Sequence, residues 1–344
     1  NSKLKNLLDK INKRKLLKKF QKVLSKKNNK KLLIIGEPIV DRFVNVKLLG
    51  KSSKSNIISS SKITENIING GTILAARTLS NFFKNIDIIL PKSNGQNFQK
   101  VLQKNVNIIN INFKKYEPVI KNRYVDEYTK NPVFQLNEND QANLADSDSK
   151  KFLQTICKLN KRKKYHKIII FDYGHGLINH ELISSLKKLK KKILVNCQSN
   201  SSNYGYNTIE KYFSFNSISL DEEEFRLTVK NKNKPINELI VQNKKIIYSF
   251  ENFILTMGKN GCYIISKKNR TVSYIPTIFE NVKNTIGAGD VFFCLYIVAK
   301  TLKIFNDFEI GIISHIGTGL YLSNDKKKIV DGFDIAKTLQ NLLK

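Results

Sequence analysis

The sequence predicts an α/β protein in which a mostly parallel sheet carries helices on both faces. The main observation is that short apolar runs, typical of buried strands, alternate with longer stretches of helical spacing. The 344 residues are 41% hydrophobic, which is enough for a sizeable core, and no repeat of fixed period is visible. At roughly 150 residues per domain, this length corresponds to about two domains or to one large domain with additions.

From residue 31 onward, the predicted elements follow one another regularly. Core strands are predicted at 31–36, 85–90, 105–111, 167–172, 192–196, 216–220 and 252–256. Helices are predicted at 72–84, 147–164, 177–191, 221–230 and 235–247, and after a hairpin at 261–275 also at 287–302, 307–323 and 333–343. Two segments, 42–68 and 117–136, break this alternation. They are extended and partly polar, which suits a small sheet that covers a site.

Residues 1–30 differ from the rest because their apolar residues recur at helical spacing among many lysines. A basic amphipathic helix of this kind can bind membranes or acidic partners, pack on its own protein, or link to a neighbouring domain. We favour a helical linker or extension over 1–30, followed by a main domain over 31–344. The first residue is Asn1 and not Met, so we expect that the chain can be part of a longer product.

The composition is strongly basic. Sixty Lys and Arg against 28 Asp and Glu give a formal net charge of +32 and a pI near 9.9. Such an excess often indicates a nucleic acid or another polyanion as partner. Here only seven of the basic residues are arginines, whereas nucleic-acid sites favour Arg for phosphates and bases. We therefore attribute most of the charge to composition and expect no specific nucleic-acid partner.

The cysteines, histidines and apolar runs exclude several other classes. The four cysteines and four histidines lie far apart, which disfavours a zinc site and a disulfide framework. The longest uncharged apolar run, 291–299, is much shorter than the roughly 20 residues that span a membrane. The charged amino terminus does not have the pattern of a signal peptide. We expect a cytoplasmic protein with no membrane span.

The clearest chemical motif is NTIGAGD at 284–290, which is followed by an apolar helical run. Glycines at a helix start let backbone amides point at one spot, and the helix dipole adds positive potential there. Such a nest would stabilise a phosphoryl group during transfer. Asp290, beside it, could accept a proton from the attacking hydroxyl group. Taken alone, the motif is equally compatible with a Gly-rich turn that places an Asp in the first helical turn.

Several motifs occur together in an order that resembles the ribokinase/PfkB family of sugar kinases. TIGAGD at 285–290 resembles the family's DTxGAGD signature, GEPIVD at 36–41 its G(D/E)xxxD segment, and Gly70-Gly71 its GG motif. Further matches are DYGHG at 172–176, DEEE at 221–224 and TMGKNG at 256–261. The resemblance covers residues 31 to about 325. It implies a ribokinase-like three-layer αβα sandwich with a small β lid, and ATP- and magnesium-dependent phosphorylation of a carbohydrate.

Within that family, the sequence most resembles the kinase domains of heptose-phosphate kinase/nucleotidyltransferase proteins. LGKSSK at 49–54 and the YGHGL loop at 173–177 carry this resemblance. It implies a heptose phosphate as substrate, for surface polysaccharide synthesis, and a fused or partner nucleotidyltransferase domain. A homodimer is also implied, because lid sheets in this family often pair between subunits. A nucleoside or other small-alcohol kinase stays open, as does a non-catalytic polyanion-binding scaffold with a vestigial kinase site.

The resemblance assigns roles to individual residues. Asp290 resembles the catalytic base, and its neighbours Gly287, Ala288 and Gly289 resemble the anion hole. The positions that match substrate contacts are Asp41, Gly70 and Gly71. Nucleotide contacts are matched by Asn196, Thr256, Gly258, Lys259 and Gly261, and the magnesium-organising segment by Asp221 and Glu224. Each position also has a plain structural interpretation, such as a turn cap for Asp41 or an ordinary surface lysine for Lys259.

Two cationic residues and two histidines near these motifs have no single interpretation. Lys121 and Arg123 could hold an anionic sugar phosphate, or belong to a solvated face. His175 is compatible with a substrate contact or with packing inside its loop. His180 lies at a predicted helix start, and we expect a structural role.

Three positions depart from the family pattern. Asn284 replaces the first Asp of DTxGAGD, which implies a changed helix start or a changed monovalent-cation site. Asp221 replaces the Asn of NxxE, and Leu74 replaces the Asn of GGxxN. Because Asp290 and both glycines are intact, we expect an active kinase with a shifted substrate pocket.

Overall fold

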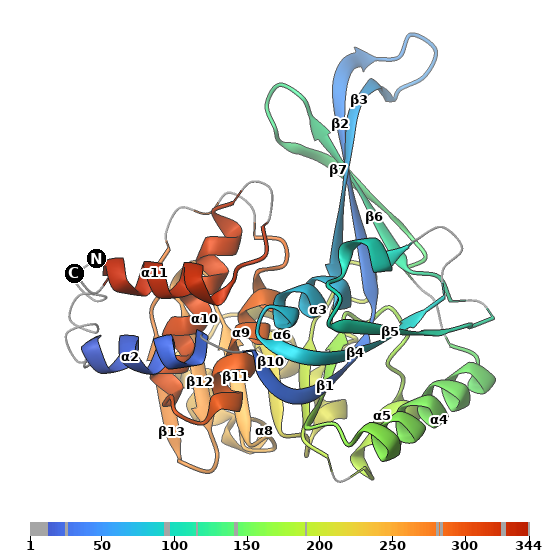
Figure 1. Ribbon diagram of the computed structural model, residues 1–344. Helices are drawn as coiled ribbons and strands as arrows, with labels where there is room; N and C mark the ends of the chain where they lie inside the picture. The colour runs from blue at the N-terminus through green and yellow to red at the C-terminus, as the bar shows by residue number, and fades with distance from the viewer. Residues whose placement is uncertain are drawn as a thin grey trace.

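The computed structural model describes residues 13–24, 27–92, 97–114, 116–140, 144–189, 191–279, 282, 285–324 and 328–342. In this part of the chain, a nine-stranded sheet is covered by helices on both faces, and a four-stranded sheet rises from one end of it (Figure 1). The predicted three-layer αβα architecture with a small additional sheet is confirmed.

The large sheet has the strand order β13-β12-β11-β10-β9-β8-β1-β4-β5. Every neighbouring pair from β5 to β11 is parallel, and β12 and β13 add an antiparallel edge. The strands are β1 (Asn28–Gly36), β4 (Phe83–Pro91), β5 (Val106–Ile111), β8 (Lys167–Asp172), β9 (Ile193–Cys197), β10 (Ser217–Asp221), β11 (Asn252–Thr256), β12 (Cys262–Ser266) and β13 (Thr271–Ile275).

The central strands are apolar along their whole length because they are buried on both faces. In β1, Leu32 and Ile34 point into one hydrophobic core, while Leu33 and Ile35 point into the other. Helices α2 (Lys13–Leu24), α3 (Thr72–Ser80), α9 (Ala288–Leu302), α10 (Asp307–Leu322) and α11 (Gly332–Leu342) contribute to the first core. The second core receives α4 (Asp146–Lys163), α5 (His180–Lys187), α6 (Glu222–Thr228), α7 (Ile236–Gln242) and α8 (Lys244–Ile247).

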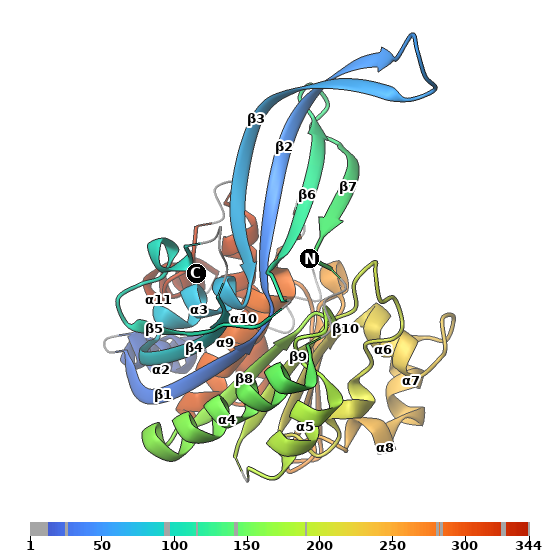
Figure 2. The same cartoon turned by 90° about the vertical axis from the view of Figure 1, so that its right-hand side faces the viewer.

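The four-stranded sheet, called the lid below, has the order β3-β2-β6-β7 and stands away from the body (Figure 2). Its strands are β2 (Pro38–Lys51), β3 (Ile58–Gly71), β6 (Val119–Asp126) and β7 (Pro132–Glu138). β2 pairs antiparallel with β3 and parallel with β6. Strand β2 is buried at its base, where Val40 and Val44 pack, and exposed toward its tip. The base of the lid therefore joins the body, and its tip does not.

Two predicted helices differ from the structure. The helix predicted over 72–84 ends at Ser80, because Phe83 begins β4, pairs with Asn28 of β1 and is buried. The helix predicted over 235–247 is divided into α7 and α8. Asn243 lies between them, and its backbone N–H and side-chain amide both donate to the carbonyl oxygen of Leu239, at 3.0 and 2.9 Å. This closes the first helix before the second begins.

Helix α2, from the region predicted as a linker, packs on the body. Leu16 and Phe20 are buried, the rings of Phe20 and Phe305 lie 6.2 Å apart, and Lys19 pairs with Glu309 at 2.8 Å. A connection to a further domain stays a prediction, and residues 1–12 lie outside the described part. Within the described residues, no helix combines the length and the apolar character that a membrane span requires.

Candidate active site

Three chain segments meet at the carboxyl ends of the parallel strands, next to the base of the lid, where ligands bind in open α/β sheets. They are the loop after β8, the loop after β9 and the first turn of α9. Asp290, in that turn, is 5% exposed. Its Oδ1 accepts hydrogen bonds from the Tyr173 hydroxyl at 2.8 Å, Asn196 Nδ2 at 2.9 Å and Gln198 Nε2 at 3.1 Å. Burial raises the pKa of Asp290 to about 7, which suits a general base at neutral pH.

The residues predicted to form an anion nest lie at the start of α9. Gly287 has a φ of 79°, in the left-handed region, and a Cβ there would lie 2.6 Å from Leu74 Cδ2. The first bond inside the helix runs from the amide of Val291 to the carbonyl oxygen of Gly287. The amides of Gly289 and Asp290 therefore have no partner within the helix. The amide of Ala288 is already used, because it donates to the carbonyl oxygen of Thr285 at 3.0 Å.

A cavity of about 390 Å³ opens beside this helix start. It brings together most of the residues predicted for the nucleotide and the anion hole: Thr256, Gly258, Lys259, Gly261, Ala288 and Gly289. Its other walls include Phe279, Phe292 and His315. Apolar and aromatic walls, with polar groups and a helix start at one end, suit a planar base that carries phosphates.

Asn196 takes a different position from the other predicted nucleotide contacts. It is the last residue but one of β9, and its side-chain amide donates to Asp290. The structure therefore connects Asn196 with the predicted base, and its contact with a nucleotide stays a prediction.

The lid brings predicted substrate contacts together, and the charges of Asp41 and Lys121 act on Asp290. In the parallel pair of β2 and β6, Asp41 lies opposite Lys121, and Arg123 follows two positions later. Asp41 is buried, and Arg123 Nε and Nη2 lie 3.0 and 2.9 Å from its Oδ1. Gly70, on β3, is close to this carboxylate, since a Cβ there would lie 2.9 Å from Asp41 Oδ2. Lys121 is half-buried, and desolvation lowers its pKa.

Gly71 has a local structural role at the same junction. Its φ is 59°, and a Cβ there would lie 2.4 Å from the carbonyl oxygen of Glu37. Gly71 ends β3 directly before α3, so it lets the lid return to the body at close distance.

The acidic residues at the end of β10 form the cap of α6. Asp221 accepts the amide of Glu224 at 2.8 Å, and Glu224 accepts the amides of Asp221 at 2.7 Å and Ser199 at 2.8 Å. Burial, followed by the charge of Asp221, raises the pKa of Glu224 to about 8. The described residues contain no group of three His, Cys, Asp or Glu side chains that could hold a metal by themselves. Two carboxylates of this kind fit magnesium that is also bound by nucleotide phosphates, because it commonly uses only one or two protein carboxylates.

The two histidines have separate surroundings. His175 is buried, its Nδ1 lies 3.0 Å from the carbonyl oxygen of Asp140 just beyond β7, and burial lowers its pKa. His180 is exposed at the start of α5. His175 thus links the loop after β8 to the end of the lid, whereas His180 lies outside this region.

Three residues of this site have no role predicted from the sequence. Tyr173 and Gln198 contact Asp290, and the fully buried Glu37 accepts the amides of Tyr173 at 2.8 Å and Leu177 at 3.1 Å. Burial, followed by the charge of Asp172, raises the pKa of Glu37. All three follow the ends of parallel strands, and that position was the signal that could have indicated them. Asn284 lies outside the described residues.

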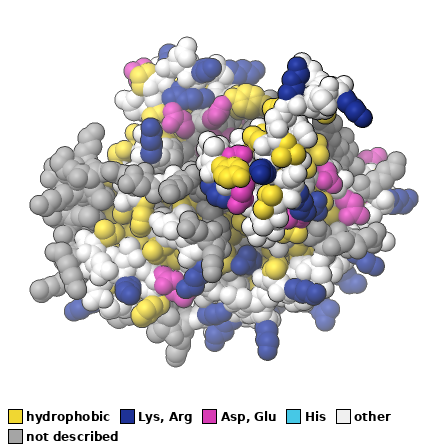
Figure 3. All heavy atoms as spheres, turned by 90° about the horizontal axis from the view of Figure 1, so that it is seen from above, with side chains coloured by type: hydrophobic (Ala, Val, Ile, Leu, Met, Phe, Trp, Pro, Cys, Tyr) yellow, Lys and Arg dark blue, Asp and Glu magenta, His cyan; other side chains and the backbone are white. Residues whose placement is uncertain are grey.

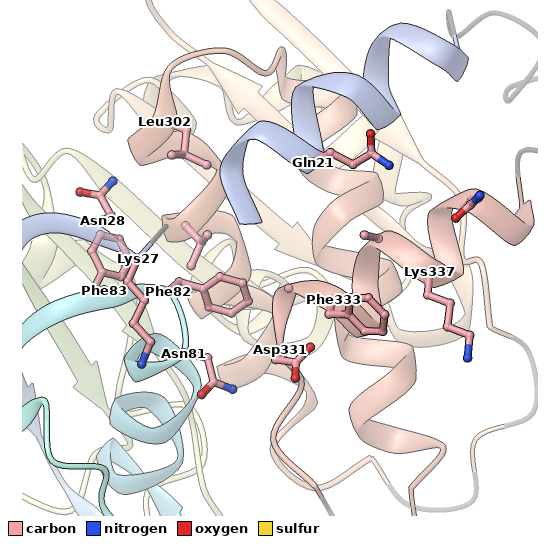
Figure 4. A pocket seen from close by; sticks show the side chains of 14 residues that line it. Gln21, Lys27, Asn28, Asn81, Phe82, Phe83, Leu302, Asp331, Phe333 and Lys337 are labelled. Atoms are coloured by element: carbon pink, nitrogen blue, oxygen red, sulfur yellow. The ribbon is translucent and has the colours of Figure 1, made fainter. Parts of the chain in front are cut away.

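A second, larger cavity of about 840 Å³ lies elsewhere, between α2, α9, α11 and the start of β4 (Figure 4). Phe82, Phe83 and Phe333 contribute aromatic walls, and Lys27 and Lys337 stand at its edge. None of the residues predicted for catalysis or binding lines it. We therefore place the candidate active site at Asp290.

Comparison with known proteins gives a family match. Residues 90–301 match the model of the pfkB family carbohydrate kinases, which is more than half of the chain. A search of the curated proteins found no match.

Solved structures give the same fold. Phosphofructokinase-2 from Escherichia coli, in complex with potassium, has a TM-score of 0.70 at 11% identity and covers 92% of this chain and 100% of its own. Ribokinase from Arabidopsis thaliana, complexed with ribose and ATP, has a TM-score of 0.64 at 13% identity and covers 92% of this chain and 99% of its own. Ribokinase from Thermotoga maritima has a TM-score of 0.65 at 13% identity and covers 91% of this chain and 99% of its own.

Proposed function

The chain belongs to the pfkB family of carbohydrate kinases, and from this premise we propose that it transfers the γ-phosphoryl group of ATP to a hydroxyl group of a phosphorylated sugar at Asp290. The observation that carries this proposal is the position of Asp290. Asp290 lies in the first turn of α9, and other residues of this turn line the 390 Å³ cavity. The charges of Asp41 and Lys121, on the lid, act on its carboxylate. A buried carboxylate between a nucleotide-sized cavity and a polar lid surface is the arrangement that in-line phosphoryl transfer requires.

In this proposal, each group has one task. Asp290 takes the proton of the sugar hydroxyl, whose oxygen attacks the γ-phosphorus while the bond to the β–γ bridging oxygen breaks and ADP leaves. The amides of Gly289 and Asp290 and the dipole of α9 stabilise the charge on the transferred group. Lys259, at the edge of the same cavity, adds a positive charge near the phosphates.

We assign magnesium, which arrives with the nucleotide, to the carboxylates of Asp221 and Glu224. When bound, magnesium would neutralise phosphate charge. The position of Asp221 supports this assignment, because Asp221 pairs with Thr256 of β11, and Thr256 lines the 390 Å³ cavity. A monovalent cation is a further proposal, for which the only support is the potassium named for the phosphofructokinase-2 structure.

The lid supports a phosphorylated substrate over a neutral one. Arg123 already pairs with Asp41, whereas the described part of the chain shows no salt bridge of Lys121. A half-buried cation that forms no salt bridge with another described residue can pair with an anionic group on the substrate. A heptose phosphate is our specific candidate, and it rests on the LGKSSK and YGHGL segments of the sequence. A nucleoside or another neutral alcohol is the alternative that a substrate panel would reveal.

We also propose that the chain forms a homodimer through the lid. Apolar side chains remain exposed on the lid strands (Figure 3), and a large exposed apolar area favours a partner. They are Leu48, Leu49, Ile58, Ile63, Ile67, Val133, Phe134 and Leu136. Sedimentation of the wild type and of Phe134→Ser would test this, with a monomeric wild type as the contradicting result.

The function is tested by ADP release over a panel of free sugars, sugar phosphates and nucleosides. We expect turnover with a sugar phosphate, and a loss of several orders of magnitude in kcat for Asp290→Asn with ATP binding retained. Unchanged turnover of that variant would exclude Asp290 as the base. Salt-sensitive nucleic-acid binding without ADP release on any acceptor would favour the scaffold alternative.

A further inference from the structure

Resting on the proposed function, we infer that Tyr173 is a positioning residue for Asp290: its hydroxyl holds Oδ1 of the carboxylate, so that Oδ2 is the atom that meets the substrate hydroxyl. Neither the sequence motifs nor the comparisons assign Tyr173 a role. Tyr173 is 4% exposed and Asp290 is 5% exposed, so this contact is shielded from water. The hydrogen bond is 2.8 Å long, a normal O–H···O distance, and away from water such a bond is electrostatically stronger than in solution.

The three donors to Asp290 all use the same oxygen. Tyr173 follows β8, Asn196 lies in β9 and Gln198 follows β9, and each donates to Oδ1. A carboxylate held by one oxygen cannot rotate freely about its Cβ–Cγ bond, and its second oxygen is fixed in direction. Fixed orientation of a base contributes to rate because the proton-accepting atom is already in place.

The backbone amide and the carbonyl oxygen of Tyr173 both form hydrogen bonds, which fix the position of its side chain. Its amide donates to Glu37 Oε2 at 2.8 Å, and its carbonyl oxygen accepts from the side-chain amide of Asn200. The next residue, Gly174, has a φ of 74°, and a Cβ there would lie 1.7 Å from Asn203 Nδ2. The loop therefore has one tightly packed conformation, and the Tyr173 hydroxyl is held by the body and not by the lid.

The hydrogen bond from Tyr173 also favours the charged form of Asp290, against the effect of burial. Other titratable groups interact electrostatically with Asp290: Asp41 on β2, Lys121 on β6, Glu224 on α6, Cys294 on α9 and Tyr321 on α10. They are unchanged by Tyr173→Phe, which removes only one hydroxyl group. The variant should raise the pKa of Asp290 by about one unit, the size expected for one charge-assisted hydrogen bond.

The test measures kcat and KM between pH 5.5 and 9 for the wild type, Tyr173→Phe and the control Tyr116→Phe. Tyr116 is also a buried tyrosine, but its hydroxyl has no hydrogen-bond partner among the described residues. In the pH profile of kcat, activity rises with pH on the acidic side (the acid limb) as the base loses its proton. We expect the acid limb of Tyr173→Phe to lie about one pH unit higher than that of the wild type, with KM for ATP within twofold. Tyr116→Phe should follow the wild type. Coinciding acid limbs of the wild type and Tyr173→Phe would overturn the inference.

A second measurement does not need the substrate. In protein with ¹³C-labelled aspartate carboxyls, the signal lost in Asp290→Asn identifies Asp290, and its titration gives the pKa directly. Placing 3-fluorotyrosine at 173 keeps the hydroxyl, and therefore the fold, while making the phenol a stronger donor. It should lower the pKa of Asp290, opposite to Tyr173→Phe, and an unchanged titration in both proteins would overturn the inference. Absence of turnover by the wild type would contradict the proposed function alone.

Discussion

Arg123 holds Asp41 through two contacts to a single carboxylate oxygen, with Nε at 3.0 Å and Nη2 at 2.9 Å from Oδ1. The two residues are 82 positions apart in the sequence, on strands β2 and β6, which pair in parallel. Asp41 is buried while Arg123 is half-buried. The carboxylate predicted to bind sugar hydroxyls is thus already oriented and charge-balanced, and its Oδ2 lies on the side of Gly70.

Arg123→Met should therefore impair both stability and substrate binding. Removing the guanidinium leaves a buried carboxylate unpaired, which costs about 2–3 kcal/mol in the free energy of unfolding. We expect KM for the sugar to rise at least tenfold because Asp41 loses its orientation, while KM for ATP changes little. Chemical denaturation and steady-state kinetics measure the two effects. If Arg123→Met lowers the free energy of unfolding by the same amount in an Asp41→Asn background, loss of the Arg123–Asp41 ion pair is not the cause.

Lys121→Met should discriminate between phosphorylated and neutral substrates. Lys121 is the half-buried cation opposite Asp41, so we expect KM for a sugar phosphate to rise about tenfold or more. KM for neutral sugars should stay within about threefold. Lys47→Met, which removes an exposed lysine from the neighbouring lid strand β2, is the control. Equal losses on both classes of substrate would show that Lys121 does not contact the phosphate.

Gly71→Ala should destabilise the protein far more than Gly50→Ala, although both glycines lie in the lid with positive φ. A Cβ at Gly71 would lie 2.4 Å from the carbonyl oxygen of Glu37, whereas none of the described atoms lies within 4 Å of a Cβ at Gly50. We expect a loss of about 3 kcal/mol or more for Gly71→Ala and about 1 kcal/mol for Gly50→Ala, from backbone strain alone. Thermal and denaturant unfolding measure the difference, and similar losses would contradict this account of the junction.

Asp290→Asn should stabilise the protein in a pH-dependent manner. Burial raises the pKa of Asp290 from 3.8 to about 7, so the unfolded chain releases this proton at lower pH than the folded protein. The wild type therefore loses stability as pH rises between these values, and Asn avoids that loss. We expect the advantage of Asp290→Asn to grow by roughly 2 kcal/mol from pH 5 to pH 8. Asp146→Asn, at an exposed position, is the control, and a constant advantage would show that Asp290 is not desolvated in this way.

Local patterns were sufficient for the large elements. The strand predicted at 252–256 coincides with β11, and the helix predicted at 307–323 ends one residue later than α10. These predictions depend only on runs of neighbouring residues, because a strand buried on both faces is apolar along its whole length. The helix predicted over 72–84 was too long, because Phe83 belongs to β4 and pairs with Asn28 of β1. This pairing joins distant segments, so neighbouring residues alone do not predict it.

By itself, the sequence determined the α/β class, the small additional sheet and the glycine-rich start of α9 before Asp290. Those features follow from periodicity and from the φ that only glycine adopts easily. Only the tertiary structure decided which groups meet. In the folded chain, Tyr173 and Gln198 donate hydrogen bonds to Asp290, and Arg123 donates to Asp41. Glu37 accepts the amide of Tyr173 in the loop after β8. Such contacts depend on strand order and register, and these are set by packing between segments that are distant in the chain.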